Sequence, residues 1–499
     1  MTKRLICIIL AASILFALAS CAADTQSPDS ESTAPAGDGT TAEATGPAET
    51  TIYYEPDHLP ENLNFGGAKT VILVPIDDRF ANEITAEELS NEPVNDSVFN
   101  RERYVEERLS VEIEQYGVKQ IDYNKTFETQ MASDDDLYQI CAAATVWFSP
   151  FIFDNYLQDL YEIDYLDFQS PWWSQLFINE ADISGHLFLT TGSLALSTRK
   201  FIYALFFNKK LAEDYSASYP DLNDLYAIVE SGDWTYDRFY SIVSQIFTDL
   251  DGNSEMNRDD FYGFGLDKTP VDTVWSSFDM KILGRDEDGW FTLDVNKDKI
   301  FLVYDMMEKL VYHTEGVFSD PDGMDNLETK FANGELLFAL CQLMSAEKPS
   351  LRNMQDEYGI VPFPKYDDAQ KEYYTYAHDQ YLTFSVPTTN TDPDTSGAVL
   401  EAMASYSYRE TVPLYLDVVL KGKYMSDAKS RRMVNTIVDA LKIDAGWIYT
   451  RSIGYFASLF RDKLIHSPSS FNTEYVKGYA MATAGIKELK RKYSTLWDS

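Results

Sequence analysis

The sequence predicts a mixed α/β fold, and three patterns near its start indicate this. Thr70–Val74 is a short, mostly β-branched run that ends before Pro75, as expected of a buried strand. A polar, acidic helical stretch follows over residues 96–109. Val111 and Ile113 then alternate with glutamates, as in a half-exposed strand. Strand, helix and strand in this order open an α/β lobe.

The same alternation continues along the chain. Thr235 is a capping residue, and the apolar residues after it recur at helical spacing: Phe239, Ile242, Val243, Ile246 and Phe247. We therefore expect a helix that starts after Thr235 and reaches Phe247. Further expected strands are His186–Thr190, Tyr203–Phe207, Leu336–Leu343, Gly359–Val361 and Leu382–Val386, and further helices are Lys209–Tyr215 and most of the chain from Ala398 onward.

Composition excludes two classes of protein. With 45% hydrophobic and 14% aromatic residues, a chain of 499 residues can bury large cores, so wholesale disorder is excluded. The formal net charge is −39, and no long Lys/Arg cluster opposes it locally. Such a chain repels phosphate backbones, so we expect no nucleic-acid partner.

The N-terminus has the three parts of an export signal. Lys3 and Arg4 precede the apolar run Leu5–Ala17, which is too short for a permanent membrane span. Leu18–Cys21 then resembles the lipobox of bacterial lipoproteins, in which the signal is cut before the cysteine and that cysteine receives lipid such as palmitate. We expect a signal peptide over residues 1–20 and lipidation of Cys21. An ordinary signal with a chance cysteine is the alternative.

The segment that follows, to about Thr51, contains no aromatic residue and no aliphatic side chain larger than alanine. Such a segment cannot offset its ordering entropy by burial. We expect residues 21–66 to comprise the lipidated cysteine and a flexible tether, with a glycosylated stalk as the alternative.

Two cysteines remain in the folded part, Cys141 and Cys341, and both lie in apolar runs. We expect two buried free thiols, with a single disulfide as the alternative. The chain has no CxxC motif and no Cys/His cluster, so it gives no support for a structural zinc site, and we expect no metal and no cofactor.

The acidic run Asp249–Asn253 suggests a calcium loop at first sight. An EF-hand loop needs glycine at its sixth position, whereas Gly252 is fourth here. We therefore interpret the run as a solvated turn and expect chelation to leave thermal stability unchanged.

Several short motifs follow one another in a fixed order: Ser170–Trp173, Tyr203–Leu211, Gly232–Thr235, Asp249–Asn253, Tyr262–Phe264, Phe331–Glu335 and Tyr358–Pro364. In order and spacing, from about residue 67 to 475, they resemble the landmarks of extracellular solute-binding proteins (family 1) of bacterial ABC importers, the broad group that includes the maltose-binding protein. Trp172 and Trp173 we assign to packing, because Pro171 and two adjacent bulky rings suit a fixed turn.

This resemblance implies a type II, two-lobe periplasmic-binding-protein fold with a hinge between the lobes. The first lobe would comprise residues 67–195 and 361–410, and the second residues 196–360 and 411–499. It also implies a lipid-anchored protein on the outer face of the cytoplasmic membrane. Such a protein captures an extracellular solute, most often a carbohydrate, and delivers it to an ABC permease without catalysis. A peptide or another small polar solute is the alternative ligand.

Alignment of the landmarks places seven residues at the ligand cleft: Thr145, Trp147, Trp275, Gln342, Asp379, Gln380 and Tyr455. Aromatic rings suit the apolar faces of sugars, and carboxylates and amides suit their hydroxyls. Gln139 stands where the resemblance implies an acid, so the alignment with the family landmarks is not fixed near Thr145. For each aromatic residue, packing in the core is the alternative.

A secreted, lipid-anchored glycoside hydrolase or other carbohydrate-active enzyme is the alternative function. Its signature would be paired carboxylates, but with 80 acidic residues close pairs arise by chance. The chain has none of the motifs GxSxG, HExxH, GxxxxGK[ST] or GxGxxG, and its five histidines lack metal-ligand spacing. A purely adhesive protein is disfavoured because no repeated modules are present.

Overall fold

The computed structural model describes residues 56–320, 326–420 and 428–497. The predicted signal peptide, Cys21 and most of the predicted tether therefore lie outside the described residues. All described residues belong to one compact unit.

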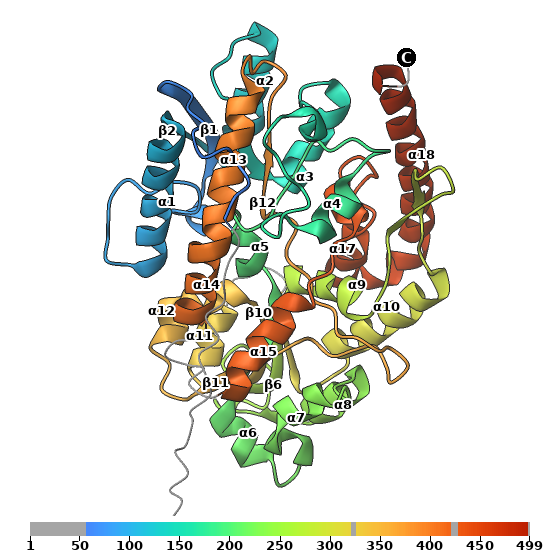
Figure 1. The fold of residues 1–499 in the computed structure, drawn as a ribbon. Helices are drawn as coiled ribbons and strands as arrows, with labels where there is room; N and C mark the ends of the chain where they lie inside the picture. The colour runs from blue at the N-terminus through green and yellow to red at the C-terminus, as the bar shows by residue number, and fades with distance from the viewer. Residues whose placement is uncertain (1–55, 321–325, 421–427, 498–499) are drawn as a thin grey trace, which may run out of the picture. The chain divides into compact units, whose positions relative to one another are not determined.

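Four strands form the first sheet in the order β12-β3-β1-β2 (Figure 1). Their bounds are β1 Ala68–Ile76, β2 Val111–Lys119, β3 Ile140–Ala144 and β12 Leu382–Ser385. Strands β2, β1 and β3 are parallel, whereas β12 runs antiparallel to β3. The buried β-branched run in β1 is the strand expected from the sequence, and so is the alternating start of β2.

A second sheet has the order β11-β4-β10-β6-β5, with β9 also paired to β6. Its strands are β4 Tyr203–Asn208, β5 Phe247–Thr248, β6 Phe261–Asp267, β9 Val317–Asp320, β10 Leu336–Gln342 and β11 Tyr358–Val361. Strands β10, β6 and β9 are parallel to one another, so their carboxyl ends meet at one edge. A separate hairpin joins β7 (Leu283–Arg285) to β8 (Phe291–Leu293).

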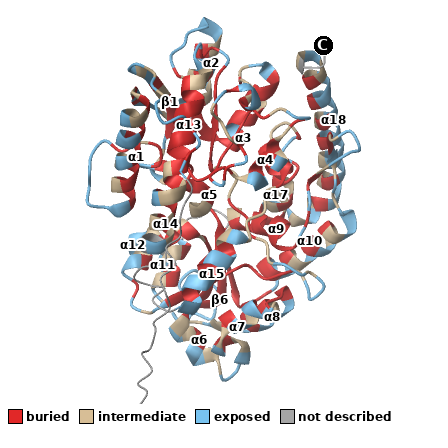
Figure 2. Ribbon diagram, viewed as in Figure 1, coloured by how far each residue is buried: buried red, intermediate tan, exposed pale blue. Residues whose placement is uncertain are grey.

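Helices pack on both sheets. Against the first lie α1 (Pro93–Leu109), α2 (Gln120–Ser133) and α13 (Pro393–Tyr406), and α13 is buried along most of its length (Figure 2). Against the second lie α6 (Lys209–Tyr215), α7 (Leu225–Glu230), α8 (Tyr236–Val243), α11 (Leu327–Ala332) and α15 (Ala428–Asp439). The expected helix over Lys209–Tyr215 is confirmed.

The remaining helices are α3 (Thr145–Phe148), α4 (Gln175–Ala181), α5 (Ser197–Lys200), α9 (Thr273–Ser277), α10 (Lys297–Tyr312), α12 (Pro349–Arg352), α14 (Val412–Leu414), α16 (Ala445–Ile448), α17 (Ser458–His466) and α18 (Phe471–Trp497). Helical structure from Ala398 onward is confirmed. Trp172 and Trp173 are buried, as expected of packing residues.

Two expected elements are wrong. The helix after Thr235 ends at Val243, because Phe247 pairs with Tyr262 as strand β5 and the chain must leave the helix to reach it. His186–Thr190 is not a strand; its backbone makes only single bridges, from His186 to Ile183 and from Thr190 to Phe384. In both places pairing with distant residues outweighs the local pattern.

Candidate functional site

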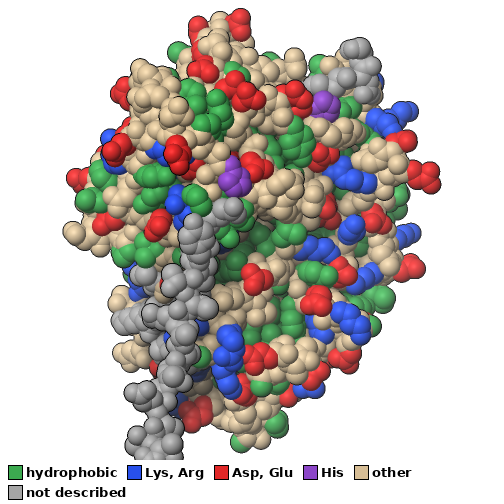
Figure 3. All heavy atoms as spheres, in the orientation of Figure 1, with side chains coloured by type: hydrophobic (Ala, Val, Ile, Leu, Met, Phe, Trp, Pro, Cys, Tyr) green, Lys and Arg blue, Asp and Glu red, His purple; other side chains and the backbone are tan. Residues whose placement is uncertain are grey.

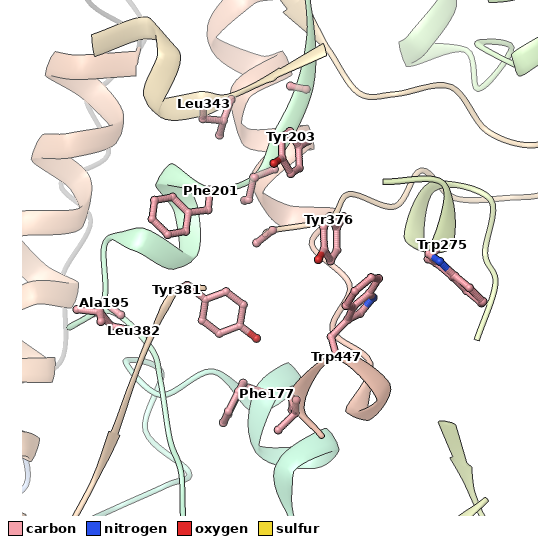
Figure 4. Close-up of a cluster of buried hydrophobic side chains, with 14 of the residues drawn as sticks. Phe177, Ala195, Phe201, Tyr203, Trp275, Leu343, Tyr376, Tyr381, Leu382 and Trp447 are labelled. Carbon is pink, nitrogen blue, oxygen red and sulfur yellow. The ribbon is translucent and has the colours of Figure 1, made fainter. Parts of the chain in front are cut away.

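Two chain segments cross between the sheets side by side. Phe201–Tyr203 leads into β4, and Tyr376–His378 leads back towards β12. The backbone N–H of Tyr203 donates to the carbonyl of Tyr376 at 2.9 Å, and that of His378 donates to the carbonyl of Phe201 at 3.0 Å. The rings of Tyr203 and Tyr376 stack with centroids 6.1 Å apart, within the aromatic cluster of Figure 4. Any rotation of one sheet against the other must therefore act on this paired crossing.

A buried acid fastens the crossing to the first sheet. Glu83 is fully buried, and one of its carboxylate oxygens accepts bonds from both the backbone N–H (3.0 Å) and the hydroxyl (2.8 Å) of Ser197. The Ser197 hydroxyl oxygen in turn accepts a bond from the backbone N–H of Leu382 at 3.0 Å. One carboxylate thus ties together the beginning of the first crossing and the end of the second.

A cavity of about 520 Å³ opens beside this crossing, a size suited to a small ligand. We call it the crossing pocket. Its polar lining comes from the segment after β1 (Arg79), from the crossing (His378, Gln380) and from the second sheet and its helices (Tyr203, Asp267, Thr269, Asp320, Asn326, Glu328, Gln342, Ser345, Lys348).

Arg79 is the residue that brings the first sheet into the pocket. It lies in the short 3-10 helix Asp78–Phe80, directly after β1. Its guanidinium binds Asp77 through two bonds of 2.9 and 2.7 Å, and it donates to Gln380 at 2.6 Å and to Gln120 at 3.0 Å. Hydrogen bonds from Arg79 lower the pKa of Asp77. We did not predict Arg79; its position just beyond a parallel strand was the available signal.

Acidic residues line the opposite side of the pocket. Asp267 and Asp320 end the adjacent parallel strands β6 and β9 and are paired in register. Glu328, in the first turn of α11, forms an ion pair with Lys348 and accepts a bond from the Ser345 hydroxyl at 2.9 Å. Burial, with the charges of Glu328 and Asp320, raises the pKa of Asp267 to about 6.

Of the seven sequence-predicted residues, Gln342 and Gln380 line the crossing pocket. Asp379 stands between two lining residues, and its carboxylate lies 3.4 Å from Nδ1 of His378. Burial lowers the pKa of His378, which favours the neutral imidazole. Thr145 begins α3 at the end of β3 and is buried.

Trp147 and Tyr455 present open ring surface, with 38% and 49% of their area exposed. The guanidinium of Arg451 lies 5.8 Å from the ring centre of Trp147. Trp147 lines a small cavity together with Gln120, the residue that accepts a hydrogen bond from Arg79. Gln120 thus lies between this small cavity and Arg79 of the crossing pocket.

Trp275 differs from the expectation that it faces a ligand. It is only 2% exposed and packs edge-on against Phe460 of α17, with ring centroids 6.1 Å apart. In Figure 4 it points away from Tyr381 and the aromatic rings of the crossing. We therefore leave Trp275 out of the candidate site.

Other chemistry-bearing groups are two thiols and one acidic loop. Cys141 and Cys341 are buried free thiols, as expected, and Cys341 lies in the lining of the crossing pocket. Within the described ranges, the one group of acids whose oxygens converge, to within 4.8 Å, is Asp249, Asp251 and Asp260. Asp249 and Asp260 each accept two backbone N–H bonds of the same loop, which closes as a turn. Acidic and basic side chains are interspersed over the face shown in Figure 3.

None of the described helices is long and apolar enough to cross a bilayer.

Two sheets joined by a paired crossing, with a polar pocket beside it, define the two-lobe α/β architecture of periplasmic binding proteins. This confirms the predicted fold class. The strands of the first sheet fall at residues 68–144 and 382–385 and those of the second at 203–361, and the exact lobe boundaries stay a prediction.

No protein-family model matches the chain, and no curated protein matches it. Among solved structures it is similar to an ABC substrate-binding protein from Listeria monocytogenes in complex with cycloalternan, at 13% identity and a TM-score of 0.51, covering 87% of this chain and 100% of the other.

It is also similar to an ABC transporter solute-binding protein from Thermotoga lettingae bound with α-D-tagatose, at 13% identity and a TM-score of 0.51, covering 85% and 100% of the two chains. A third similar structure is the sugar-binding protein MalE from Xanthomonas citri, at 10% identity and a TM-score of 0.53, covering 87% and 100%. At these identities the likeness establishes the fold.

Proposed function

We propose that this protein is a substrate-binding protein that captures a carbohydrate and passes it to an ABC permease without changing it chemically. The observation that carries the proposal is the crossing pocket itself. Amides, carboxylates and one arginine from both sheets converge on a ligand-sized cavity beside the hinge. Such groups can donate to and accept from the hydroxyls of a sugar on several sides at once.

Closure of the two sheets around the ligand is the mechanism. Arg79 and Gln380 stand on one side of the pocket and Gln342 and Asp267 on the other, so a ligand that contacts both sides stabilises the closed arrangement. A ligand shifts such an equilibrium only by its differential affinity for the closed form. The closed surface then becomes the form that the permease recognises.

The named ligands of the similar structures support a carbohydrate rather than a peptide. Those structures hold cycloalternan and α-D-tagatose, and the third is a sugar-binding protein. They are described as binding proteins, which supports binding without catalysis for this chain.

A thermal-shift screen of the purified protein against sugars, amino acids and peptides tests this proposal, with chromatography of each ligand afterwards. A ligand at a hundredfold excess over its Kd stabilises the fold by about 2.7 kcal/mol. A shift with a sugar recovered intact supports the proposal. A sugar recovered cleaved would instead make the protein a carbohydrate-active enzyme, with the pocket carboxylates as the first candidates for its acid and base.

We further propose that the protein is held at the outer face of the cytoplasmic membrane by lipid on Cys21. The basic, apolar and small-residue parts of the N-terminal sequence support this. In a bacterial expression host, Cys21→Ala is expected to release the protein from the membrane fraction, and Cys7→Ala, within the same signal, to leave it there. Retention of Cys21→Ala in the membrane fraction contradicts the anchor.

A further inference from the structure

The crossing pocket contains an acid, Asp267, that has no basic partner among the described residues. The pocket holds two strong cations, and each is already paired: Arg79 with Asp77, and Lys348 with Glu328. In the part of the chain that the structure describes, Asp267 accepts bonds from the backbone N–H (3.1 Å) and hydroxyl (3.5 Å) of Thr269. Among the described residues it makes no ion pair.

The surroundings of Asp267 make it more costly to cover its carboxylate without an opposite charge. It is partly buried at the end of β6, with Asp320 beside it in register and Glu328 near enough to act on its charge. Covering an unpaired carboxylate with a neutral ligand removes its water and supplies no opposite charge. A ligand cation would replace that water with a charge-assisted hydrogen bond.

The described acids of the pocket differ from a cluster that would hold a metal ion. The one group of three acids whose oxygens converge within 4.8 Å in the described part of the chain is Asp249, Asp251 and Asp260, in a different loop. Among the described residues, the pocket acids do not form such a group of three. Their spread around a cavity of about 520 Å³ suits an organic ligand that carries its charge on one substituent.

We propose that the preferred ligand is an amino sugar, bound with its protonated amine at Asp267. This inference rests on the proposed function and narrows its substrate class. The hydroxyls of the sugar would contact the amides of Gln342 and Gln380, and its ammonium group would face Asp267. The formal charge of −39 attracts a cationic ligand at long range as well.

Isothermal titration calorimetry on the purified protein tests the inference with matched sugars that differ in one amine. The pairs are glucosamine and glucose, galactosamine and galactose, and the β-1,4-linked trimer of glucosamine and cellotriose. At neutral pH and low salt we expect the amine member of at least one pair to bind about tenfold tighter or more, which corresponds to about 1.4 kcal/mol. High salt is expected to reduce this preference.

Two variants separate the charge at Asp267 from other effects. Asp267→Asn keeps the shape of the side chain and should abolish the preference for the amine. Asp298→Asn, at an exposed position in the first turn of α10, removes the same net charge outside the pocket and should keep it. Thermal melts check that both variants are folded.

The possible results distinguish this inference from the proposed function. Equal or tighter binding of the neutral members, or a preference that persists in Asp267→Asn, overturns the amino-sugar assignment and leaves carbohydrate binding intact. Failure of every sugar to bind, here and in the thermal-shift screen, overturns both.

Discussion

The tripeptide Thr-Val-Trp occurs twice in this protein, and the two copies have opposite environments. Thr145–Trp147 begins α3 after β3, and Thr273–Trp275 begins α9 after β6. In both copies the threonine and valine are buried, but the tryptophan is 38% exposed in the first and 2% exposed in the second. Identical local sequence therefore does not decide whether a ring faces solvent or the core.

The residue before each tripeptide explains the difference. Ala144 precedes the first copy, and Asp272 precedes the second. Asp272 is fully buried and forms an ion pair with Arg461 of α17, the helix whose Phe460 covers Trp275. The pair thus holds α17 over the second tryptophan. Trp147 is 38% exposed, and the guanidinium of Arg451 lies 5.8 Å from its ring centre.

Truncating the two tryptophans should give the largest contrast. Trp275→Ala leaves a cavity in the core and is expected to lower the free energy of unfolding by about 4 kcal/mol, whereas Trp147→Ala should change it by about 0.5 kcal/mol or less. Urea unfolding followed by circular dichroism measures both. Equal losses would show that the exposure of Trp147 does not reflect its packing.

Removing Asp272, the acid that precedes the second copy, should lower the free energy of unfolding slightly less than Trp275→Ala does. Asp272→Ala leaves Arg461 mostly buried without its carboxylate partner, and we expect a loss of about 3 kcal/mol together with greater quenching of Trp275 fluorescence by acrylamide. Asp462→Ala is the control, because Asp462 also contacts Arg461 but is exposed, so its loss should be about 1 kcal/mol or less. Similar costs for both would refute the role given to the buried pair.

A third tryptophan extends the comparison to pH. Trp173 is buried like Trp275, but its indole N–H donates to Glu401 at 2.8 Å. Burial raises the pKa of Glu401 to about 7, and the bond from Trp173 opposes this only in part. The folded state therefore holds a proton that the unfolded state releases at lower pH, so this contribution to stability is lost as pH rises from about 4.5 to about 7.

Glu401→Gln removes the titrating group, so its stability should not fall in this way as the pH rises. Relative to the unmodified protein, we expect its free energy of unfolding to rise by about 2 kcal/mol between pH 5 and pH 8. Urea unfolding across this range measures the difference. A constant difference at all pH values would mean that Glu401 titrates at its ordinary pKa.

The smallest expected effect concerns binding at the exposed copy. Trp147→Ala should weaken the binding of a sugar identified in the screen by about 1 kcal/mol, close to fivefold, because a stacking surface is removed. Trp147→Phe should restore part of the affinity. Calorimetry measures both. Unchanged affinity in Trp147→Ala would remove Trp147 from the site and leave the crossing pocket as the whole of it.

Much of the fold could be predicted because buried strands are continuous apolar runs. Strands β1, β4 and β10 were recognisable in this way. The short strand β5 was not, since its Phe247 continues a helical spacing and only its partner Tyr262 makes it a strand.

The site was less predictable because it joins residues that are remote in sequence. Arg79 and its partner Gln380 are 301 positions apart, and no local pattern links them. Gln342 and Gln380, which line the crossing pocket, were predicted through the landmarks of a family. Trp275 was misplaced because the covering helix α17 lies almost two hundred positions further along the chain.

The antiparallel pairing of β12 with β3 determines how early the first sheet can fold. The hydroxyl of Thr383 donates to the carbonyl of Ala143, 240 positions earlier, at 2.9 Å. The first sheet therefore cannot be completed until most of the chain, including the strands of the second, has been synthesised. Contacts of such long range slow folding. A chain that stays unfolded longer is better able to cross a membrane before it folds, which is what the proposed position outside the cytoplasmic membrane requires.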